Sequence, residues 1–376
     1  EMREAVIVSA VRTPVGKAGK GSYKNVRPED LGAAVIKGAM DKVPGLSGED
    51  VEDVIFGCAM PEGQQGLNVA RTISLLAGLP KSVPAQTVNR FCSSGLQTIA
   101  SAAERIMAGW ADVIVAGGVE SMSAVPMGGH TPRPHPWTVA NDPGLFTGMG
   151  NTAEIVATRY DISREKQDAM AARSHDNALK AIAEGKFNDE IIPFGDLDVD
   201  EGPRPGSTVE KLGKLRPVFS TKGSVTAGNS SQMSDGAAAT VVMSREKAEA
   251  LGADILGILR DFVVVGVEPD EMGIGPACAV PKLLERQGLT IEDIDLVELN
   301  EAFASQGVYC IEQIGVDPDK VNVNGGAVGL GHPLAATGTR LVLTLAHELR
   351  RSGGRYGVAT ACIGGGQGIA MVIEAM

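Results

Sequence analysis

Cysteine is scarce in this chain, and no apolar run is long enough to form a membrane-spanning helix. The five cysteines are an odd number and include no CxxC pair, a usage that fits neither a disulfide framework nor a zinc site. Reduced thiols in a cytoplasmic protein are therefore expected. A helix that crosses a bilayer needs roughly 18 or more consecutive apolar residues. We therefore predict no membrane partner.

Positive charge is also in short supply. Lys and Arg total 34 against 46 Asp and Glu, and the resulting net charge of −12 disfavours a nucleic-acid-binding surface. The glycine run at 364–366 is not followed by the Lys-Ser/Thr pair of a phosphate-binding loop. Nucleic acids are thus not expected partners, although a local basic pocket remains possible.

Glycine, by contrast, is abundant. The 48 glycines among 376 residues are nearly twice the usual frequency of about 7%. They indicate many tight turns and close backbone approaches. The chain length predicts two or three domains, at roughly 100 to 200 residues per domain.

An internal repeat organises the chain. The segment LSGEDVEDVIFG at 46–57 resembles LTIEDIDLVELN at 289–300, with an offset of 243 residues. The same offset carries an amphipathic helix at 33–42 onto 276–285 and Gly95 onto Gly338. It also carries a strand at 111–118 onto 354–361. One offset through several elements predicts a duplicated fold.

We predict an α/β fold of two duplicated halves, each with a mixed, mostly parallel sheet and covering helices. The first half spans 1–120 and is completed by about 236–256, and the second spans 257–376. Residues 121–235 have no counterpart in the repeat and form an inserted domain. Helices are expected in it at 152–160 and 164–184, the second with Ser163 as its N-cap.

Cys92 stands where a strand leads into a helix. Apolar residues after it recur at helical spacing, and residues 85–88 before it have no helical period. Unpaired amides and the helix dipole favour an anion at such a place, so we expect Cys92 to have a lowered pKa and to act as a nucleophile. Cys58, Cys278 and Cys310 are expected to pack against apolar surface instead.

Three residues of the second half are expected at comparable loop ends. Asn300 follows a strand, His332 directly precedes a helix, and Cys362 ends what we expect to be the last strand. Ligands bind at the carboxyl ends of strands in doubly wound sheets. The duplication therefore predicts that these three residues face Cys92.

Five motifs together resemble the thiolase family, and within it the degradative 3-ketoacyl-CoA thiolases. They are NRFCSSGLQ at 89–97, TAGNSSQMSDGAAA at 226–239, NEAFASQ at 300–306, NGGAVGLGHP at 324–333 and CIGGGQG at 362–368. The resemblance covers essentially the whole chain. It implies a thiolase-like fold, an acyltransferase of fatty acid β-oxidation, and a coenzyme A binding role for the insert.

The resemblance also implies roles for catalytic residues. Cys92 is similar to the acyl-accepting nucleophile, His332 to its base and Cys362 to a second acid/base. Asn300 is similar to the residue that holds a water which, with His332, stabilises the thioester enolate. The backbone amides of Cys92 and Gly364 would stabilise the oxyanion at the acyl group.

Substrate contacts follow from the same resemblance. Arg204 is similar to an arginine beside the adenine and phosphates of coenzyme A, and Ser231 to a pantetheine contact. Met149, Met272 and Phe303 are similar to residues that wall the acyl and pantetheine tunnel. Acyl-CoA and coenzyme A are thus the expected substrates, and no metal or cofactor is expected.

Three departures from the family pattern stand out. The segment 192–202 is short, which affects the expected adenine contacts, and Ala335 replaces a commoner glycine. The loop 127–147 lacks the basic hairpin of tetrameric members, which favours a homodimer. A dimer of dimers, or a complex with other β-oxidation enzymes, remains open.

Other functions remain open from sequence. An acetyl-CoA acetyltransferase is the nearest alternative, although the CSSG sequence and the loop 127–147 disfavour it. A carrier-protein-dependent ketoacyl synthase typically has histidine at the place of Asn300 and no counterpart of Cys362. A non-catalytic lipid carrier would not require Cys92, His332, Cys362 and Asn300 together.

Overall fold

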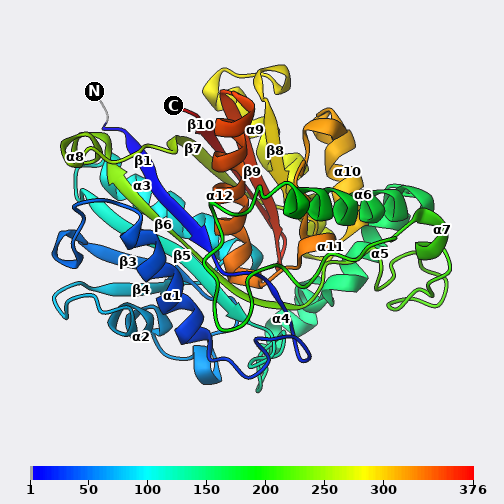
Figure 1. The fold of residues 1–376 in the computed structure, drawn as a ribbon. Coiled ribbons are helices and arrows are strands. Elements are labelled where there is room, and N and C mark those ends of the chain that lie inside the picture. The colour runs from blue at the N-terminus through cyan, green and yellow to red at the C-terminus, as the bar shows by residue number, and fades with distance from the viewer. Residues whose placement is uncertain (1–2) are drawn as a thin grey trace.

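A computed structural model describes residues 3–376 and shows one continuous mixed sheet with helices on both faces (Figure 1). The strands are β1 (Ala5–Arg12), β2 (Gly16–Lys17), β3 (Asp53–Gly57), β4 (Ala85–Val88), β5 (Val113–Ser121), β6 (Ser234–Ser244), β7 (Gly257–Gly266), β8 (Leu296–Leu299), β9 (Tyr356–Ile363) and β10 (Gln367–Glu374). The helices are α1 (Pro28–Asp41), α2 (Val69–Leu76), α3 (Ser94–Met107), α4 (Pro136–Asn141), α5 (Met149–Arg159), α6 (Arg164–Ala183), α7 (Val209–Leu212), α8 (Arg245–Leu251), α9 (Gly275–Gln287), α10 (Ala304–Ile314), α11 (Ala327–Leu330) and α12 (Leu334–Ser352).

The sheet consists of two related halves joined edge to edge. Its strand order is β4-β3-β5-β6-β1-β7-β10-β9-β8, and β2 pairs with β6 outside this order. The halves meet where Ala5–Ile7 of β1 pairs with 257–259 of β7. Strand β3 is parallel to β4 and β5, β8 is parallel to β9, and the central pairs are antiparallel. The predicted two-half α/β fold with a mixed sheet is confirmed, although antiparallel strand pairs outnumber the parallel pairs that were expected to predominate. The joining of the halves into one sheet was not predicted.

The duplication is visible in the placement of the elements. An offset of 243 residues relates β3 to β8, α3 to α12 and β5 to β9. The prediction that Cys362 ends the last strand was wrong, because β10 follows β9 and pairs with it as a hairpin. The turn between them contains Gly365 and Gly366 at φ +85° and +87°, a backbone conformation that favours glycine.

Helices α3 and α12 pack against each other on the inner face of the sheet. One apolar cluster contains Leu96 and Ile106 of α3, Leu341 and Leu345 of α12, and residues of strands from both halves. The helices cross at Gly95 and Gly338, the pair that the repeat aligns. A Cβ at Gly95 would lie 2.4 Å from the Ala335 carbonyl oxygen, so the crossing requires a residue without a side chain. The N-termini of α3 and α12 are thereby brought together.

The outer face of each half is covered by its own helices. Residues of α1 and α2 pack on the first half, and residues of α9 and α10 pack on the second. Within residues 3–376, none of the helices has the length and apolar character needed to cross a bilayer.

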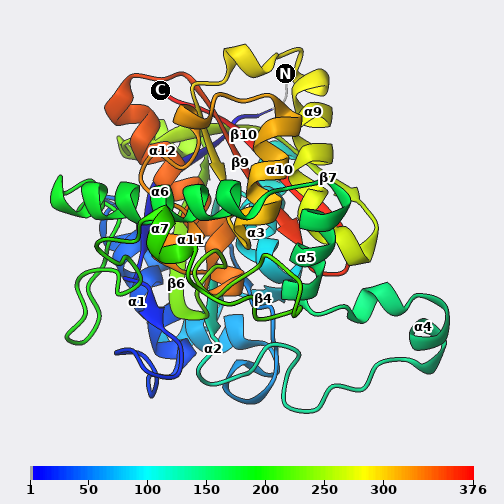
Figure 2. The ribbon, with the colours of Figure 1, turned by 90° about the vertical axis from the view of Figure 1, so that its right-hand side faces the viewer.

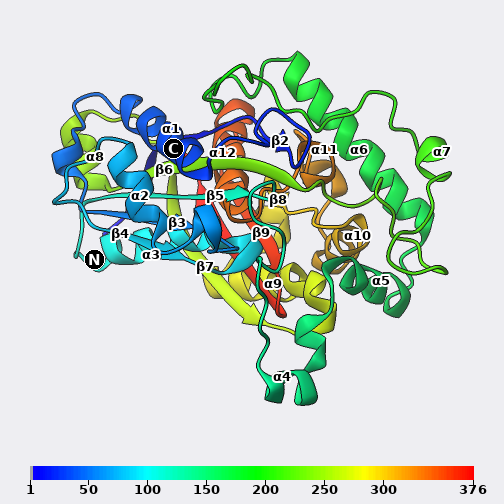
Figure 3. The ribbon, with the colours of Figure 1, turned by 90° about the horizontal axis from the view of Figure 1, so that it is seen from below.

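The region 121–235 supplies α4 to α7 and lies mainly along the second half. Helix α6 begins after Ser163, whose side chain accepts a hydrogen bond from the Lys166 amide, as predicted. Ser174 of α6 donates a hydrogen bond of 2.6 Å to Glu301, next to Asn300. The segment with α4 extends away from the rest of the molecule (Figures 2 and 3).

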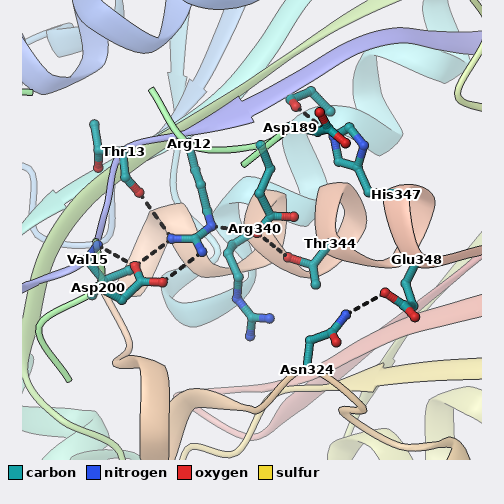
Figure 4. A network of polar contacts seen from close by, with 12 residues as sticks. Arg12, Thr13, Val15, Asp189, Asp200, Asn324, Arg340, Thr344, His347 and Glu348 are labelled. Carbon is teal, nitrogen blue, oxygen red and sulfur yellow. Dashed lines mark hydrogen bonds and ion pairs between the residues drawn. The ribbon is translucent and has the colours of Figure 1, made fainter. Parts of the chain in front are cut away.

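A buried ion-pair network joins this region to the central strands and to α12 (Figure 4). Arg12 of β1 donates a 2.8 Å hydrogen bond to Glu190 and bonds of 2.7 and 2.9 Å to Asp200. Thr344 of α12 donates a hydrogen bond of 3.1 Å to the same Glu190 oxygen. All four side chains are buried. The network therefore fixes the path of the chain between α6 and α7.

Candidate active site

Cys92 lies in a strained turn between β4 and α3. A single 3-10 turn at Phe91–Ser93 separates the two elements. Phe91 has φ +44°, a left-handed conformation that costs a bulky residue energy. Two hydrogen bonds hold it there, because the Phe91 amide donates to the Asn89 side chain at 2.9 Å and Ser94 donates to the Phe91 carbonyl at 2.7 Å. The predicted strand, turn, cysteine and helix order is confirmed.

The expectation of a lowered Cys92 pKa was wrong. Burial raises the pKa of the thiol to about 11, while hydrogen bonds from the backbone amides of Gly364 and Cys92 lower it by less. The thiol is 6% exposed, so water contributes little to the stabilisation of a thiolate. Cys92 is therefore a protonated thiol at neutral pH, and a base must remove its proton as it attacks.

His332 is the candidate for that base. Its backbone amide donates to the Ser234 hydroxyl at 3.0 Å and to the Gln232 carbonyl at 3.1 Å, which places the residue directly ahead of α12. Burial, together with the positive charge of Arg340, lowers the pKa of His332 to about 3. The imidazole is thus neutral at physiological pH and can accept a proton.

Asn300 lies beside His332 at the end of β8. The Asn300 amide nitrogen Nδ2 is 3.4 Å from His332 Nε2. Its backbone amide donates to the Thr360 carbonyl at 3.0 Å, which holds the residue against β9. Among residues 3–376, the fully buried Asn300 Oδ1 has no hydrogen-bond partner. Such an oxygen can accept a hydrogen bond from a ligand or a water.

Cys362 approaches Cys92 from β9. Its side chain is fully buried, and this burial, followed by the nearby Cys92, raises the pKa of Cys362 well above its ordinary value. The thiol is therefore protonated, as a proton donor requires. Gly364 follows two residues later and directs its amide at Cys92. The structure thus pairs Cys362 and Gly364 with Cys92, and Asn300 with His332. Leu334 and Ala335, which follow His332 in the chain, pack in the apolar cluster that contains Cys92.

The residues expected to wall the tunnel also gather at Cys362. Met272 and Phe303 are buried in one apolar cluster with it, and Met149 packs against the same cluster. A Cβ at Gly364 would lie 3.6 Å from the Met149 sulfur. Met149, Met272 and Phe303 therefore form an apolar wall beside Cys362 and Gly364.

The two residues expected to contact coenzyme A, Ser231 and Arg204, lie in different places. The Ser231 amide donates to the Ala302 carbonyl at 3.0 Å, which places Ser231 beside Phe303. Arg204 instead has an exposed side chain on a loop of the insert, and its amide donates to His175 Nδ1 at 3.0 Å. Arg204 therefore lies at the surface of the molecule.

The remaining cysteines differ from one another. Cys58 and Cys310 are buried in apolar clusters, as predicted. The prediction for Cys278 was wrong, because it is exposed on α9. In residues 3–376 there is also no group of three or more His, Cys, Asp or Glu side chains that could hold a metal ion.

Sequence reasoning missed Glu120, a buried carboxyl group at the end of β5. Its oxygens accept hydrogen bonds from the amides of Ala59 and Met60 at 2.8 and 3.0 Å. Burial raises the pKa of Glu120 to about 7. Ala59 packs in the same cluster as Cys92, so Glu120 supports one wall of the site. The available signal was an acidic residue that directly follows the apolar run at 113–119.

Sequence reasoning also missed Thr337. Its hydroxyl oxygen lies 2.6 Å from His332 Nδ1, on the side of the ring opposite Asn300. The available signal was its spacing, since Thr337 is five residues after His332 and one turn into the helix that follows.

Comparison with known proteins yields consistent matches over nearly the full chain. The model of the thiolase N-terminal domain matches residues 5–246, and that of the thiolase C-terminal domain matches 253–375. A 3-ketoacyl-CoA thiolase of Bacillus subtilis is 55% identical over 99% of this chain and all of its own length. That alignment spans 390 positions, more than the 376 residues of this chain.

Two solved structures share the fold. A Bacillus anthracis acetyl-CoA acetyltransferase has a TM-score of 0.92 at 44% identity, and human mitochondrial 3-ketoacyl-CoA thiolase has 0.92 at 39%. Each match covers 100% of this chain and 99% of the other. The fold alone therefore does not separate these two activities.

Proposed function

This chain belongs to the thiolase family and is an acyltransferase, and we propose that it cleaves 3-ketoacyl-CoA with coenzyme A through an acyl-Cys92 intermediate. The products are acetyl-CoA and an acyl-CoA shortened by two carbons, as in fatty acid β-oxidation. The observation that carries the proposal is the geometry of two buried cysteines near each other, with the Gly364 amide at Cys92 and with the buried His332 paired to Asn300 ahead of α12.

The first half-reaction breaks the carbon–carbon bond. The Cys92 sulfur attacks the 3-keto carbon while its proton moves to His332 Nε2. The adduct then collapses, and the bond between C2 and C3 breaks to leave the acyl group on Cys92 and an acetyl-CoA enolate. Cys362 gives its proton to C2 of this enolate. General-acid help of this kind is typically worth roughly 10² to 10⁴ in rate.

The second half-reaction restores the original protonation state of each residue. Coenzyme A gives its thiol proton to the Cys362 thiolate and attacks the acyl group on Cys92. Cys92 leaves as a thiolate and recovers its proton from His332. Both cysteines and the histidine are thus restored, and no oxidant or reductant is needed.

Two groups of donors stabilise the negative charges that develop. The amides of Cys92 and Gly364 face the oxyanion at the acyl carbon. Protonated His332, with a water on Asn300, faces the enolate oxygen. A lost donor of this type costs about 2.7 to 4 kcal/mol of transition-state stabilisation.

Coenzyme A is proposed to run from this centre past Ser231 to Arg204 at the surface. The proposal is supported by the exposed guanidinium of Arg204 in a chain of net charge −12. We further propose a cytoplasmic homodimer without nucleic-acid or membrane partners. The loop 127–147 supports a dimer, since it carries α4 and a single arginine, Arg133, in place of a basic hairpin.

One assay series tests the function. Purified protein receives coenzyme A and 3-ketoacyl-CoA substrates of increasing chain length, and released acetyl-CoA is measured. Peptide mass spectrometry after a brief reaction is expected to show the acyl group on Cys92. Label on another cysteine would contradict the mechanism, and condensation of acetyl-CoA without thiolysis of longer substrates would favour the acetyltransferase.

The same preparation provides two internal checks. Arg204→Ala is expected to raise the KM for coenzyme A at nearly unchanged kcat, the result of lost uniform binding. Sedimentation is expected to give about twice the chain mass of 38.9 kDa. An unchanged KM, or a fully active monomer, would remove the corresponding part of the proposal.

A further inference from the structure

His332 can act as a base at Nε2 only in one of its two neutral tautomers. A neutral imidazole carries its proton either on Nδ1 or on Nε2, and the other nitrogen holds the lone pair. The proposed reaction needs the lone pair on Nε2, the nitrogen that faces Asn300. Something must therefore favour the proton on Nδ1.

Thr337 provides an acceptor for that proton. Its hydroxyl oxygen lies 2.6 Å from His332 Nδ1 and 3.1 Å from the Pro333 carbonyl oxygen. A hydroxyl has one hydrogen, and the carbonyl can only accept, so the Thr337 hydrogen points to Pro333. The Thr337 oxygen is then free to accept a hydrogen bond from the Nδ1–H of His332.

The neighbour of Nε2, on the opposite side of the imidazole ring, also favours a proton on Nδ1. Asn300 Nδ2, a donor, is 3.4 Å from His332 Nε2, so Nε2 faces it as an acceptor. Both neighbours thus favour the same tautomer.

The partner at Nδ1 is also uncharged. A carboxylate at this position, as in a Ser-His-Asp triad, orients the ring and stabilises the imidazolium. Here the nearest charged neighbour on α12 is Arg340, which is buried and pairs with Glu298 at 2.8 Å. A neutral hydroxyl selects the tautomer without favouring a protonated ring.

We infer that Thr337 is a positioning residue that holds His332 as the Nδ1–H tautomer, with the lone pair on Nε2, the nitrogen that faces Asn300. The inference rests on the proposed function for its catalytic consequence, but the tautomer itself can be observed without any substrate. It assigns Thr337 an effect on the removal of the Cys92 proton and none on substrate affinity.

The tautomer is measured first, in the wild-type protein. Histidine-selective ¹⁵N labelling gives five imidazoles, and loss of one set of signals in His332→Ala identifies His332. Long-range ¹H–¹⁵N spectra distinguish the two neutral tautomers. Protonation at Nδ1 is expected at pH 7, and protonation at Nε2 would overturn the inference irrespective of any variant.

Three variants then test the consequence. Thr337→Val keeps the shape of the side chain and removes the hydroxyl, whereas Thr337→Ser retains it. Thr344→Val is the matched control, since Thr344 is on the same helix and fully buried, and the change removes its hydroxyl and its hydrogen bond to Glu190. The readouts are the single-turnover rate of Cys92 acylation and the KM for the acyl-CoA.

Thr337→Val is expected to slow acylation at least tenfold with the KM within twofold of wild type, by analogy with outer-shell partners of metal-ligating histidines, which typically contribute factors of about 10 to 100. The acylation rates of Thr337→Ser and of Thr344→Val should both lie within threefold of the wild-type rate. Acylation by Thr337→Val at the wild-type rate, or equal losses in both valine variants, would overturn the inference. A wild-type protein that is never acylated would instead refute the proposed function.

Discussion

At the scale of single residues, burial outweighs helix position in setting the state of the nucleophile. Cys92 stands at the mouth of a helix, and two backbone amides lower its pKa, yet burial raises the pKa to about 11. The position of Cys92 could be predicted from local spacing. Its protonation state could not, because burial depends on Leu334 and Ala335, which are distant in sequence.

The raised pKa of Cys92 leads to a prediction about the role of His332. In His332→Asn, Cys92 can react only after ionising by itself, so its alkylation by iodoacetamide should be slow at pH 7. The rate should rise about tenfold per pH unit up to pH 10, below the pKa of about 11 at which the thiolate becomes the main form. In the wild type, the pKa of about 3 keeps His332 neutral throughout this range, and the dependence should be shallower.

His347→Asn is the matched control for this experiment. His347 lies on α12, where its Nε2 is 3.2 Å from the Ala10 carbonyl oxygen. Alkylation at Cys92 is followed by peptide mass spectrometry in all three proteins. Equal rates and slopes in the wild type and His332→Asn would show that His332 does not assist Cys92.

At the scale of helices and strands, the elements that could be predicted are those whose sequence pattern is local to the element. Helix α6 and its Ser163 cap were predicted because periodicity and capping are local. Strand β10 was not recognised, because it follows the glycine turn 364–366 at once and belongs to neither aligned segment of the repeat. Thr337 was missed because its role depends on the rotation of α12 relative to His332.

The Arg12 network gives a prediction about stability at this scale. Arg12→Ala leaves Glu190 and Asp200 buried without their cation, and removal of one partner of a buried ion pair typically costs about 3 to 5 kcal/mol. We expect a loss of that size in the free energy of unfolding, measured by denaturant titration.

Lys166→Ala supplies the comparison. Lys166 pairs with Glu312 between α6 and α10, and the two side chains are 54% and 44% exposed. An exposed pair contributes about 0 to 1 kcal/mol, so this variant should unfold near the wild-type denaturant concentration. A similarly small change in Arg12→Ala would mean that the network does not hold the insert in place.

At the scale of the whole molecule, the duplication assembles the site from both halves. The first half supplies Cys92, and the second supplies Asn300, His332 and Cys362. The crossing of α3 and α12 at Gly95 and Gly338 holds these contributions together. The 243-residue offset made the meeting of the halves predictable. Their joining through β1 and β7 was not, since that pairing covers only three residues on each strand.

Cys92 and Cys362 differ in the proton transfers that their proposed roles require. Acylation of Cys92 by an acyl-CoA involves only sulfur nucleophiles and leaving groups. Cleavage of the carbon–carbon bond also requires proton transfer at the α-carbon of acetyl-CoA, the role given to Cys362.

The most direct test of the proposed mechanism compares acylation with carbon–carbon bond cleavage in Cys362→Ala, with Cys92→Ala as the control. Cys362→Ala should still be acylated on Cys92 by acetyl-CoA and exchange coenzyme A. Thiolysis and α-proton exchange should each fall by about 10² or more, the usual size of general acid–base catalysis. Cys92→Ala should lose every activity that passes through the acyl-enzyme. Near-normal thiolysis by Cys362→Ala, together with loss of acylation, would show that the roles assigned to the two cysteines are reversed.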